Sequence, residues 1–111
     1  MSISYSWRGA FTDTEVNELH AEAFGTRVFT SEEWPWQRLT AQHSLGWVTA
    51  RDGDELVGFV NVLSDGLVHA WIQDVMVSTS HRRTGVGRAV VAAATDGARA
   101  ARSEEHTSEL Q

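Results

Sequence analysis

The sequence predicts an α/β domain of the α+β type, in which helices flank a mostly antiparallel sheet. Three observations support this prediction. The region 47–77 shows the two-residue apolar period of half-buried strands, and two Asp-Gly turn signals divide it. Residues 12–24 and 86–97 instead carry apolar side chains at helical spacing. With a short strand at 3–7 and a second helix before residue 47, the expected order is strand, two helices, three strands and a final helix.

Length and composition limit the possible functions. A chain of 111 residues, of which 41% are hydrophobic, is long enough for one small domain with a core. The net charge of -6 argues against general nucleic-acid binding, and the absence of Cys excludes disulfides and thiolate chemistry. The N-terminus lacks a signal-peptide core, and no apolar run approaches membrane-spanning length. We therefore expect a cytoplasmic protein that binds neither nucleic acid nor membrane.

The N-terminal segment predicts one strand and one helix. Residues 3–7 alternate apolar and polar side chains, as a half-buried strand does. Thr12 and Glu15 form the Thr-x-x-Glu pattern of a helix capping box, and Gly25 is placed to end that helix. The apolar face of this helix is expected to consist of Val16, Leu19, Ala23 and Phe24.

A second helix is expected to start at Ser31. This residue can cap its N-terminus, with Glu32 and Glu33 in the first turn, where the helix dipole favours acidic side chains. Pro35 still falls within the part of a helix that tolerates proline. The inner face is expected to contain Trp36, Leu39 and His43, as core residues or as the wall of a binding site.

Three strands are expected to follow as an antiparallel meander. The first hairpin joins residues 47–51 to residues 56–63 through the Asp-Gly-Asp turn at 52–54. A second turn at 64–66 leads into a third strand at 69–77.

The segment between the third meander strand and the last helix has the composition of a phosphate-binding loop. Gly85 and Gly87 lack the Cβ atoms that hinder close approach of an anion. The following helix offers free N–H groups and the positive end of its dipole. Cationic side chains gather at the same place, namely those of His81, Arg82, Arg83 and Arg88. A diphosphate suits such a loop, although a solvated turn with surface charges has the same composition.

Two other phosphate-binding motifs do not fit this loop. A P-loop ends in Gly-Lys-Ser/Thr, and the chain contains no Lys. A dinucleotide-binding fingerprint needs a third glycine at the position of Val90.

Arg82, Gly85 and Gly87 stand in the pattern Arg-x-x-Gly-x-Gly, between a strand and a helix, and here the sequence resembles the GCN5-related N-acetyltransferase (GNAT) superfamily. The resemblance covers roughly residues 3–101. It implies the N-terminal part of the GNAT fold. It also implies acetyl-CoA as the cosubstrate and an amine of a small molecule or peptide as the acceptor.

The resemblance further implies where the cosubstrate lies. Backbone groups of Val75, Met76 and Val77 would hold the pantetheine arm, and an N–H group near Met76 or Val77 would polarise the thioester. Arg82 and Arg83 would bind the pyrophosphate or would be surface charges beside a loop whose amides alone bind it. The residues implied for this loop are Arg82, Arg83, Thr84, Gly85, Val86, Gly87 and Arg88.

Acyl transfer also needs a base for the acceptor and an acid for the leaving thiolate. Asp74 is the first candidate for the base, because it is an ionisable group in a largely apolar strand beside the expected thioester. It could instead be a solvent-facing carboxylate paired with an arginine. His69 is the second candidate. The five His residues show no metal-ligand spacing, so no metal is expected.

The end of the chain departs from the family pattern. A later Tyr commonly protonates the thiolate in this family, but the only Tyr here is Tyr5. The last ten residues, RSEEHTSELQ, look like the in-frame translation of a sequencing-library adapter. We therefore expect residues 1–101 to be a partial GNAT domain without the family's C-terminal strands and helix, and residues 102–111 to be a non-native tail. The unpaired edge of the strand at 69–77 would then favour self-association.

The sequence thus predicts a GNAT-type N-acetyltransferase that transfers an acetyl group from acetyl-CoA to a primary amine. The chain itself is expected to be truncated and inactive. One alternative is a non-catalytic acyl-CoA-binding domain, which the missing acid would suit. Another is an α/β interaction domain with a fortuitous Gly/Arg turn.

Overall fold

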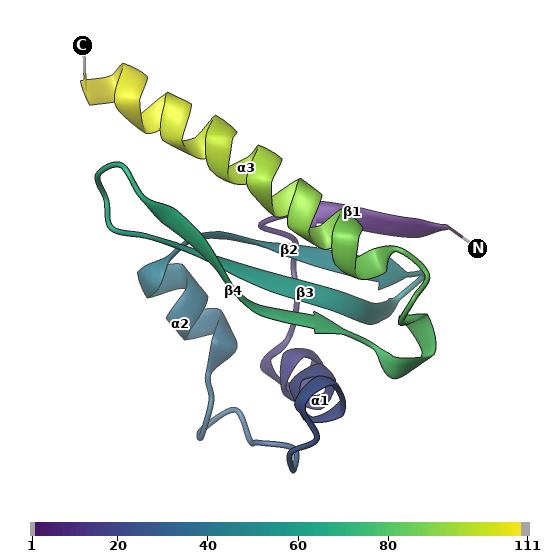
Figure 1. Ribbon diagram of the computed structural model, residues 1–111. Coiled ribbons are helices and arrows are strands. Elements are labelled where there is room, and N and C mark those ends of the chain that lie inside the picture. The colour runs from purple at the N-terminus through teal and green to yellow at the C-terminus, as the bar shows by residue number, and fades with distance from the viewer. Residues whose placement is uncertain (1, 110–111) are drawn as a thin grey trace.

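The computed structural model describes residues 2–109, with side chains described as far as Arg102. Its centre is a four-stranded antiparallel sheet in the order β1-β2-β3-β4 (Figure 1). The strands are β1 (Ile3–Trp7), β2 (Ser44–Asp52), β3 (Glu55–Ser64) and β4 (Ala70–Val77). The helices are α1 (Asp13–Phe24), α2 (Trp36–His43) and α3 (Val86–Glu109), with a short 3-10 helix at Thr79–His81. The predicted fold class and element order are confirmed.

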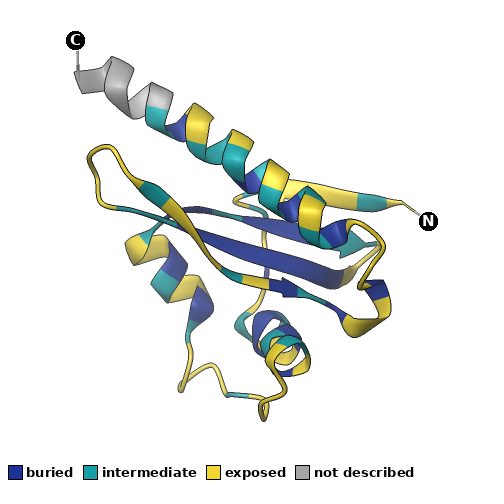
Figure 2. Cartoon of the chain, viewed as in Figure 1, coloured by how far each residue is buried: buried dark blue, intermediate teal, exposed yellow. Residues whose placement is uncertain are grey.

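The sheet separates two layers of helices. α1 and α2 lie on one face, and α3 crosses the other (Figure 1). Buried residues lie on the sheet and on the helix turns that face it (Figure 2). On the α3 face the core is built of small residues, including Val48, Val60, Val62, Val86, Val90 and Ala94. On the opposite face it is built mainly of larger ones, including Phe11, Leu19, Trp36, Phe59 and Met76.

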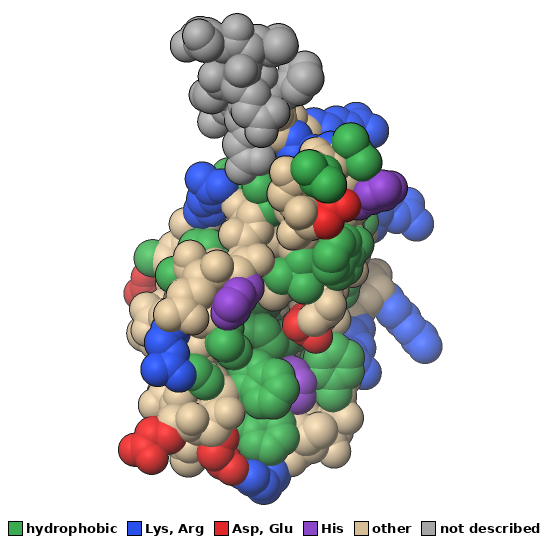
Figure 3. Space-filling view, turned by 90° about the vertical axis from the view of Figure 1, so that its left-hand side faces the viewer, with side chains coloured by type: hydrophobic (Ala, Val, Ile, Leu, Met, Phe, Trp, Pro, Cys, Tyr) green, Lys and Arg blue, Asp and Glu red, His purple; other side chains and the backbone are tan. Residues whose placement is uncertain are grey.

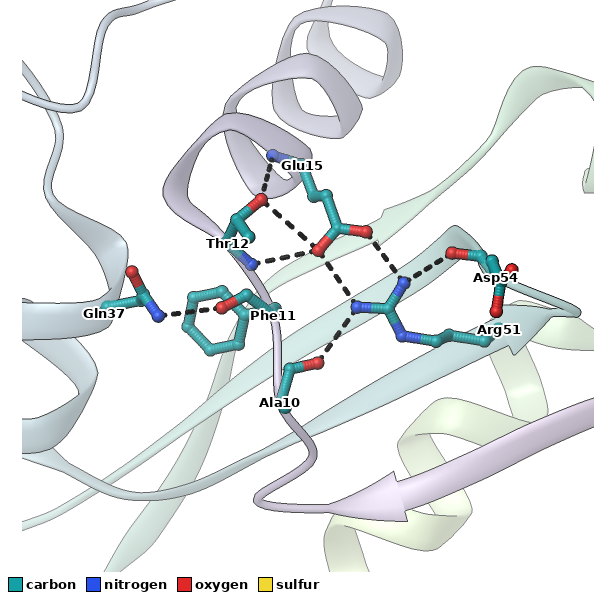
Figure 4. Close-up of polar contacts among 7 residues, drawn as sticks. All are labelled: Ala10, Phe11, Thr12, Glu15, Gln37, Arg51 and Asp54. Atoms are coloured by element: carbon teal, nitrogen blue, oxygen red, sulfur yellow. Dashed lines mark hydrogen bonds and ion pairs between the residues drawn. The ribbon is translucent and has the colours of Figure 1, made fainter.

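Helix α1 begins and ends where the sequence predicts. The side chain of Thr12 accepts a hydrogen bond from the backbone N–H of Glu15, whose carboxylate accepts one from the backbone N–H of Thr12 (Figure 4). Gly25 ends the helix in the left-handed region, with φ of 68°. The expected burial of Phe24 is wrong, because this side chain is 50% exposed at the last turn. Asn17 is buried instead, and its carbonyl accepts a hydrogen bond from Trp36 Nε1 at 2.8 Å.

Helix α2 starts later than the sequence predicts. Pro35 is its N-cap, and residues 31–33 form a separate turn. Thr30 and Glu33 exchange hydrogen bonds between side chain and backbone there, as in a capping box, but no helix follows. The reason is Pro35, which disfavours helical backbone at the residue before it. Within α2, Trp36 is buried and His43 is exposed, so the expected inward position of His43 is wrong.

The predicted meander is confirmed. β2 pairs with β3 through a two-residue turn in which Gly53 has φ of 63°. β2 starts at Ser44, earlier than expected, and β1 pairs with its outer side. β4 starts at Ala70, because His69 belongs to the preceding turn. There the carboxylate of Asp65 accepts hydrogen bonds from the backbone N–H groups of Leu67 and His69.

The indole of Trp7 fills the space between the sheet and α3. A Cβ atom on Gly46 of β2 would lie 2.1 Å from one ring carbon of Trp7, and a Cβ atom on Gly97 of α3 would lie 2.2 Å from another. Both glycines are therefore required for close packing rather than for backbone freedom.

Two expectations concern the ends of the chain and membranes. For the expected tail at 102–111, residues 110–111 and the side chains from residue 103 lie outside the described residues. None of the helices in the described part of the chain has both the length and the apolar character needed to cross a membrane.

Candidate functional site

A β-bulge interrupts the pairing of β4 with β3. Phe59 pairs with Met76 and Asn61 pairs with Gln73, so that Asp74 and Val75 together face a single residue of β3. Asp74 has φ of 59°, which places it in the left-handed region. β4 is also the last strand of the sheet, and its outer edge has no strand partner in the described chain. This edge therefore offers backbone donors and acceptors to an extended ligand.

The three residues expected to hold the pantetheine arm lie next to this bulge. Val75 is exposed, Met76 is fully buried in the core beneath α1, and Val77 packs partly against the α3 core. Their side chains point to different surroundings. If all three residues bind the pantetheine arm, they must do so through their backbone groups.

The loop after β4 leads directly into a helix start. The N–H of Ser78 still bonds to Val57 O at 2.8 Å, and the 3-10 helix follows. Arg83 and Gly85 have φ of 65° and 93°. The first helical hydrogen bond of α3 runs from the N–H of Ala89 to Gly85 O. Within the described chain, the N–H groups of residues 83–88 donate no close backbone hydrogen bond; that of Val86 is buried, and the others lie at exposed or half-buried positions that an anion can reach.

The cationic side chains of this loop have different surroundings. Arg82 Nη2 donates a hydrogen bond to Ala23 O at the end of α1, at 3.1 Å. Arg83 and Arg88 are exposed and form no ion pair with the described residues. Of the other loop residues, Thr84 donates a hydrogen bond to His81 O, Val86 is buried, and Gly87 lies against Val77.

His81 differs from the expectation that it presents charge to the same anion. Its side chain is only 7% exposed. Nε2 lies 3.1 Å from Asp52 Oδ2 in β2, and Nδ1 lies 2.9 Å from Ser80 Oγ. Its ring therefore faces the protein interior.

The structure separates the two candidates for the catalytic base. Asp74 is half-buried at the bulge, and its carboxylate lies 3.5 Å from Gln73 Nε2. It forms no ion pair with an arginine of the described chain. His69 lies in the turn at the opposite end of β4 from the loop, exposed, with Nδ1 3.1 Å from Asp65 Oδ2. Only Asp74 is thus close to the residues implied for the cosubstrate.

Sequence reasoning missed Glu22 of α1. Its carboxylate accepts hydrogen bonds from the backbone N–H of Thr79 at 2.6 Å, from the Thr79 hydroxyl and from the Ser78 hydroxyl. The hydrogen bond from the Thr79 side chain is the main cause that lowers the pKa of Glu22. No local pattern could have indicated this contact, because 57 residues separate its partners.

Apolar surface lies beside β4 and at the turn that precedes it. A groove of about 300 Å³ runs between β4 and α3, with Arg99 and Arg102 in its lining. Its apolar lining residues are Val62, Ala70, Trp71, Ile72, Ala94 and Ala98. Figure 3 looks onto the end of the molecule that carries the β3–β4 turn and shows hydrophobic side chains gathered on this face. The exposed hydrophobic residues include Leu67, Val68 and Trp71. In the described chain, no group of His, Asp and Glu side chains has the arrangement of a metal site.

Comparison with known proteins gives one family. The family model described as acetyltransferase (GNAT) family matches residues 13–110. No curated protein sequence matches the chain significantly.

Solved structures share the fold. A probable acetyltransferase from meticillin-resistant Staphylococcus aureus superposes with a TM-score of 0.71 at 22% identity, over 86% of this chain and 68% of that one. A GNAT family protein from Streptococcus pneumoniae gives 0.69 at 26% identity, over 88% and 69%. An aminoglycoside 6'-N-acetyltransferase complexed with coenzyme A gives 0.70 at 19% identity, over 91% and 57%. The chain thus spans about two thirds of the length of the first two proteins and less of the third.

Proposed function

Because the chain belongs to the acetyltransferase (GNAT) family, we propose that it binds acetyl-CoA and supports transfer of the acetyl group to a primary amine of a small molecule or peptide. The observation that carries this proposal is the set of N–H groups at residues 83–88, at the start of α3, that lack a close backbone acceptor and, apart from the buried Val86, can be reached from solvent. These amides and the positive end of the helix dipole would bind the diphosphate, and the exposed Arg83 and Arg88 would add charge. In support, one protein of the same fold is described as complexed with coenzyme A.

The edge of β4 would bind the pantetheine arm. An extended amide-containing chain can pair with an open strand edge as an additional strand would. The bulge at Asp74 and Val75 removes the regular pairing with β3 at this point. A backbone N–H near Met76 or Val77 would then be available to polarise the thioester carbonyl.

In the acyl-transfer step, the nitrogen of the neutral amine attacks the thioester carbonyl carbon. A C–N bond forms, the C–S bond breaks, the nitrogen loses a proton, and the CoA thiolate gains one. Asp74 is the proposed acceptor of the first proton, because it is the one carboxylate in β4 and lies half-buried at the bulge.

A second candidate function is acyl-CoA binding without catalysis. The observation that favours it is the position of Tyr5, the only Tyr of the chain, in β1. β1 and β4 are the two opposite edges of the sheet, so Tyr5 is not near the proposed thioester site. The two functions differ in whether bound acetyl-CoA is consumed in the presence of an amine.

Isothermal titration calorimetry with CoA tests the proposed binding site. Saturable binding to one site is expected for CoA, and much weaker binding for adenosine, which lacks the diphosphate. A CoA titration that stays flat at millimolar ligand contradicts the proposal and leaves only the fold. If CoA binds, release of free thiol from acetyl-CoA in the presence of a panel of amines separates transfer from binding alone.

Self-association through β4 is a further part of the proposal, with a second copy of the chain as the partner. Its support is the open edge together with the exposed side chains of Trp71, Ile72 and Val75.

A further inference from the structure

A continuous network of polar side chains, here called the polar network, lies beneath the start of the phosphate-binding loop. It begins at Asp52 in β2, whose Oδ2 lies 3.1 Å from His81 Nε2. His81 Nδ1 lies 2.9 Å from Ser80 Oγ, which lies 2.9 Å from Ser78 Oγ. Ser78 Oγ lies 3.3 Å from Glu22 Oε1 in α1. The loop is therefore linked to an element on each side, the β2–β3 hairpin and α1.

The polar network is connected directly to the loop that carries the free N–H groups. His81 immediately precedes Arg82, and its backbone carbonyl accepts the hydrogen bond from the Thr84 hydroxyl. His81 and Ser78 are 7% and 4% exposed, so most of their contacts with water are replaced by these partners. A shift of the His81 ring would therefore move the backbone from which residues 83–88 extend.

The number of hydrogen atoms available for hydrogen bonds within the polar network depends on the charge of His81. Four contacts join the five groups, and the two terminal carboxylates can only accept. The two serine hydroxyls supply one hydrogen each, and a neutral imidazole supplies one more, so that one contact lacks a hydrogen. An imidazolium supplies two hydrogens, so that each of the four contacts contains one. In that form His81 donates to Asp52 and Ser80, Ser80 donates to Ser78, and Ser78 donates to Glu22.

We infer that His81 is a positioning residue for the phosphate-binding loop and that it acts as an imidazolium when the loop is occupied. This inference rests on the proposed function, because the loop is taken to bind the CoA diphosphate. The charged groups close to this network are Asp52 from β2, Glu22 from α1 and Arg82, which contributes to lowering the pKa of Glu22, while Arg83 and Arg88 lie further along the loop. The imidazolium thus pairs with Asp52, and its effect on the bound anion runs through the position of the loop and not through direct contact.

The test compares the CoA affinity of three variants by calorimetry. His81→Gln retains a donor for Asp52 but carries no charge, and Ser80→Ala removes the second contact at an exposed position. Each is expected to weaken CoA binding by about tenfold, the size of a hydrogen bond to a charged group. His43→Gln, an exposed histidine of α2, is the matched control and is expected to bind like the wild type.

The protonation state is read from the imidazole ¹⁵N spectrum of the CoA-saturated wild type. Both His81 nitrogens are expected to carry hydrogen. Wild-type affinity in Ser80→Ala, or a neutral His81 tautomer in the complex, overturns the inference while CoA binding itself stands. If the wild type shows no saturable CoA binding, the proposed function fails and the inference fails with it.

Discussion

The indole of Trp7 in β1 lies directly against Gly97 of α3, so closely that a Cβ atom on Gly97 would come within 2.2 Å of the ring. Alanine normally stabilises a helix relative to glycine by about 1 kcal/mol. Here the methyl group would meet a rigid ring that is itself enclosed by Gly46 of β2. The steric cost of overpacking, about 1–3 kcal/mol, exceeds the gain in helix propensity.

We therefore expect Gly97→Ala to lower the melting temperature of the protein, as measured by circular dichroism. Gly87→Ala is the matched control in the same helix, because a Cβ atom there would meet only Val77, at an ordinary 3.5 Å. A Gly97→Ala variant that melts at or above the temperature of Gly87→Ala would show that Trp7 can move aside.

The ion pair between Glu15 and Arg51 makes stability depend on pH. Arg51 donates to both carboxylate oxygens of Glu15, at 2.7 and 3.0 Å, and this contact joins α1 to β2 (Figure 4). The hydrogen bond from Arg51 is the main cause that lowers the pKa of Glu15 below its ordinary value of 4.5. A carboxylate with a lowered folded-state pKa contributes stability that is fully present above the unfolded-state pKa. That contribution is lost as the pH falls through the folded-state pKa.

Glu15→Gln should accordingly reduce the free energy of unfolding by about 1 kcal/mol at pH 7. The difference from the wild type should shrink as the pH is lowered below 4.5, which urea titrations at several pH values would measure. Glu18→Gln, at an exposed position of the same helix, is the matched control. A gap between Glu15→Gln and wild type that is the same at pH 7 and pH 3 contradicts the assignment.

The arginines of the loop should contribute unequally to CoA binding. Arg83 and Arg88 are exposed and form no ion pair in the described chain, so each is available to a phosphate. Replacing either with Ala should weaken CoA binding roughly three- to tenfold at low salt, and less as salt screens the charge. The measurement is calorimetry at two salt concentrations. Arg38→Ala in α2 is the control for a general loss of positive charge.

Arg82→Ala should act chiefly on stability. Its guanidinium donates to Ala23 O, one of the carbonyl groups at the end of α1 that lack a helical partner. We expect a small fall in melting temperature, with a change in CoA affinity below that of Arg83→Ala. A larger loss of affinity in Arg82→Ala than in Arg83→Ala would place the Arg82 guanidinium on the ligand.

Self-association should depend on β4 rather than on exposed hydrophobic residues in general. Ile72→Lys places a charge on the open edge strand, where charged residues discourage strand pairing. Light scattering after size-exclusion chromatography should show a concentration-dependent mass for the wild type and a monomer for Ile72→Lys. Val28→Lys, at an exposed loop position, should behave like the wild type. Equal masses for both variants would contradict a role for β4.

Local chemistry made much of the fold predictable. The Thr12–Glu15 capping box, the turn at Gly53 and the Val/Ala face of α3 each depend on residues close together in the sequence. The start of α2 was mispredicted because Ser31, Glu32 and Glu33 have the composition of a helix start. Thr30 and Glu33 do exchange capping hydrogen bonds, but Pro35 prevents this turn from continuing into a helix.

The site was predictable only in part, for a related reason. Glycines, arginines and a helix start mark an anion loop locally. The burial of His81, however, depends on Asp52, which is 29 residues away, and the anchor at Glu22 is more distant still. Such contacts are fixed by the packing of the sheet against α1 and by the hairpin, and no sequence spacing encodes them.

The left-handed backbone at Asp74 restricts which amino acids can stand at the proposed proton acceptor. Aspartate, asparagine and glycine adopt this conformation readily, whereas the β-branched residues typical of strands do not. The backbone conformation and the proton transfer therefore each restrict this position to a few amino acids, and aspartate satisfies both requirements. Asp74→Asn separates them, because it preserves the shape of the strand and removes only the negative charge.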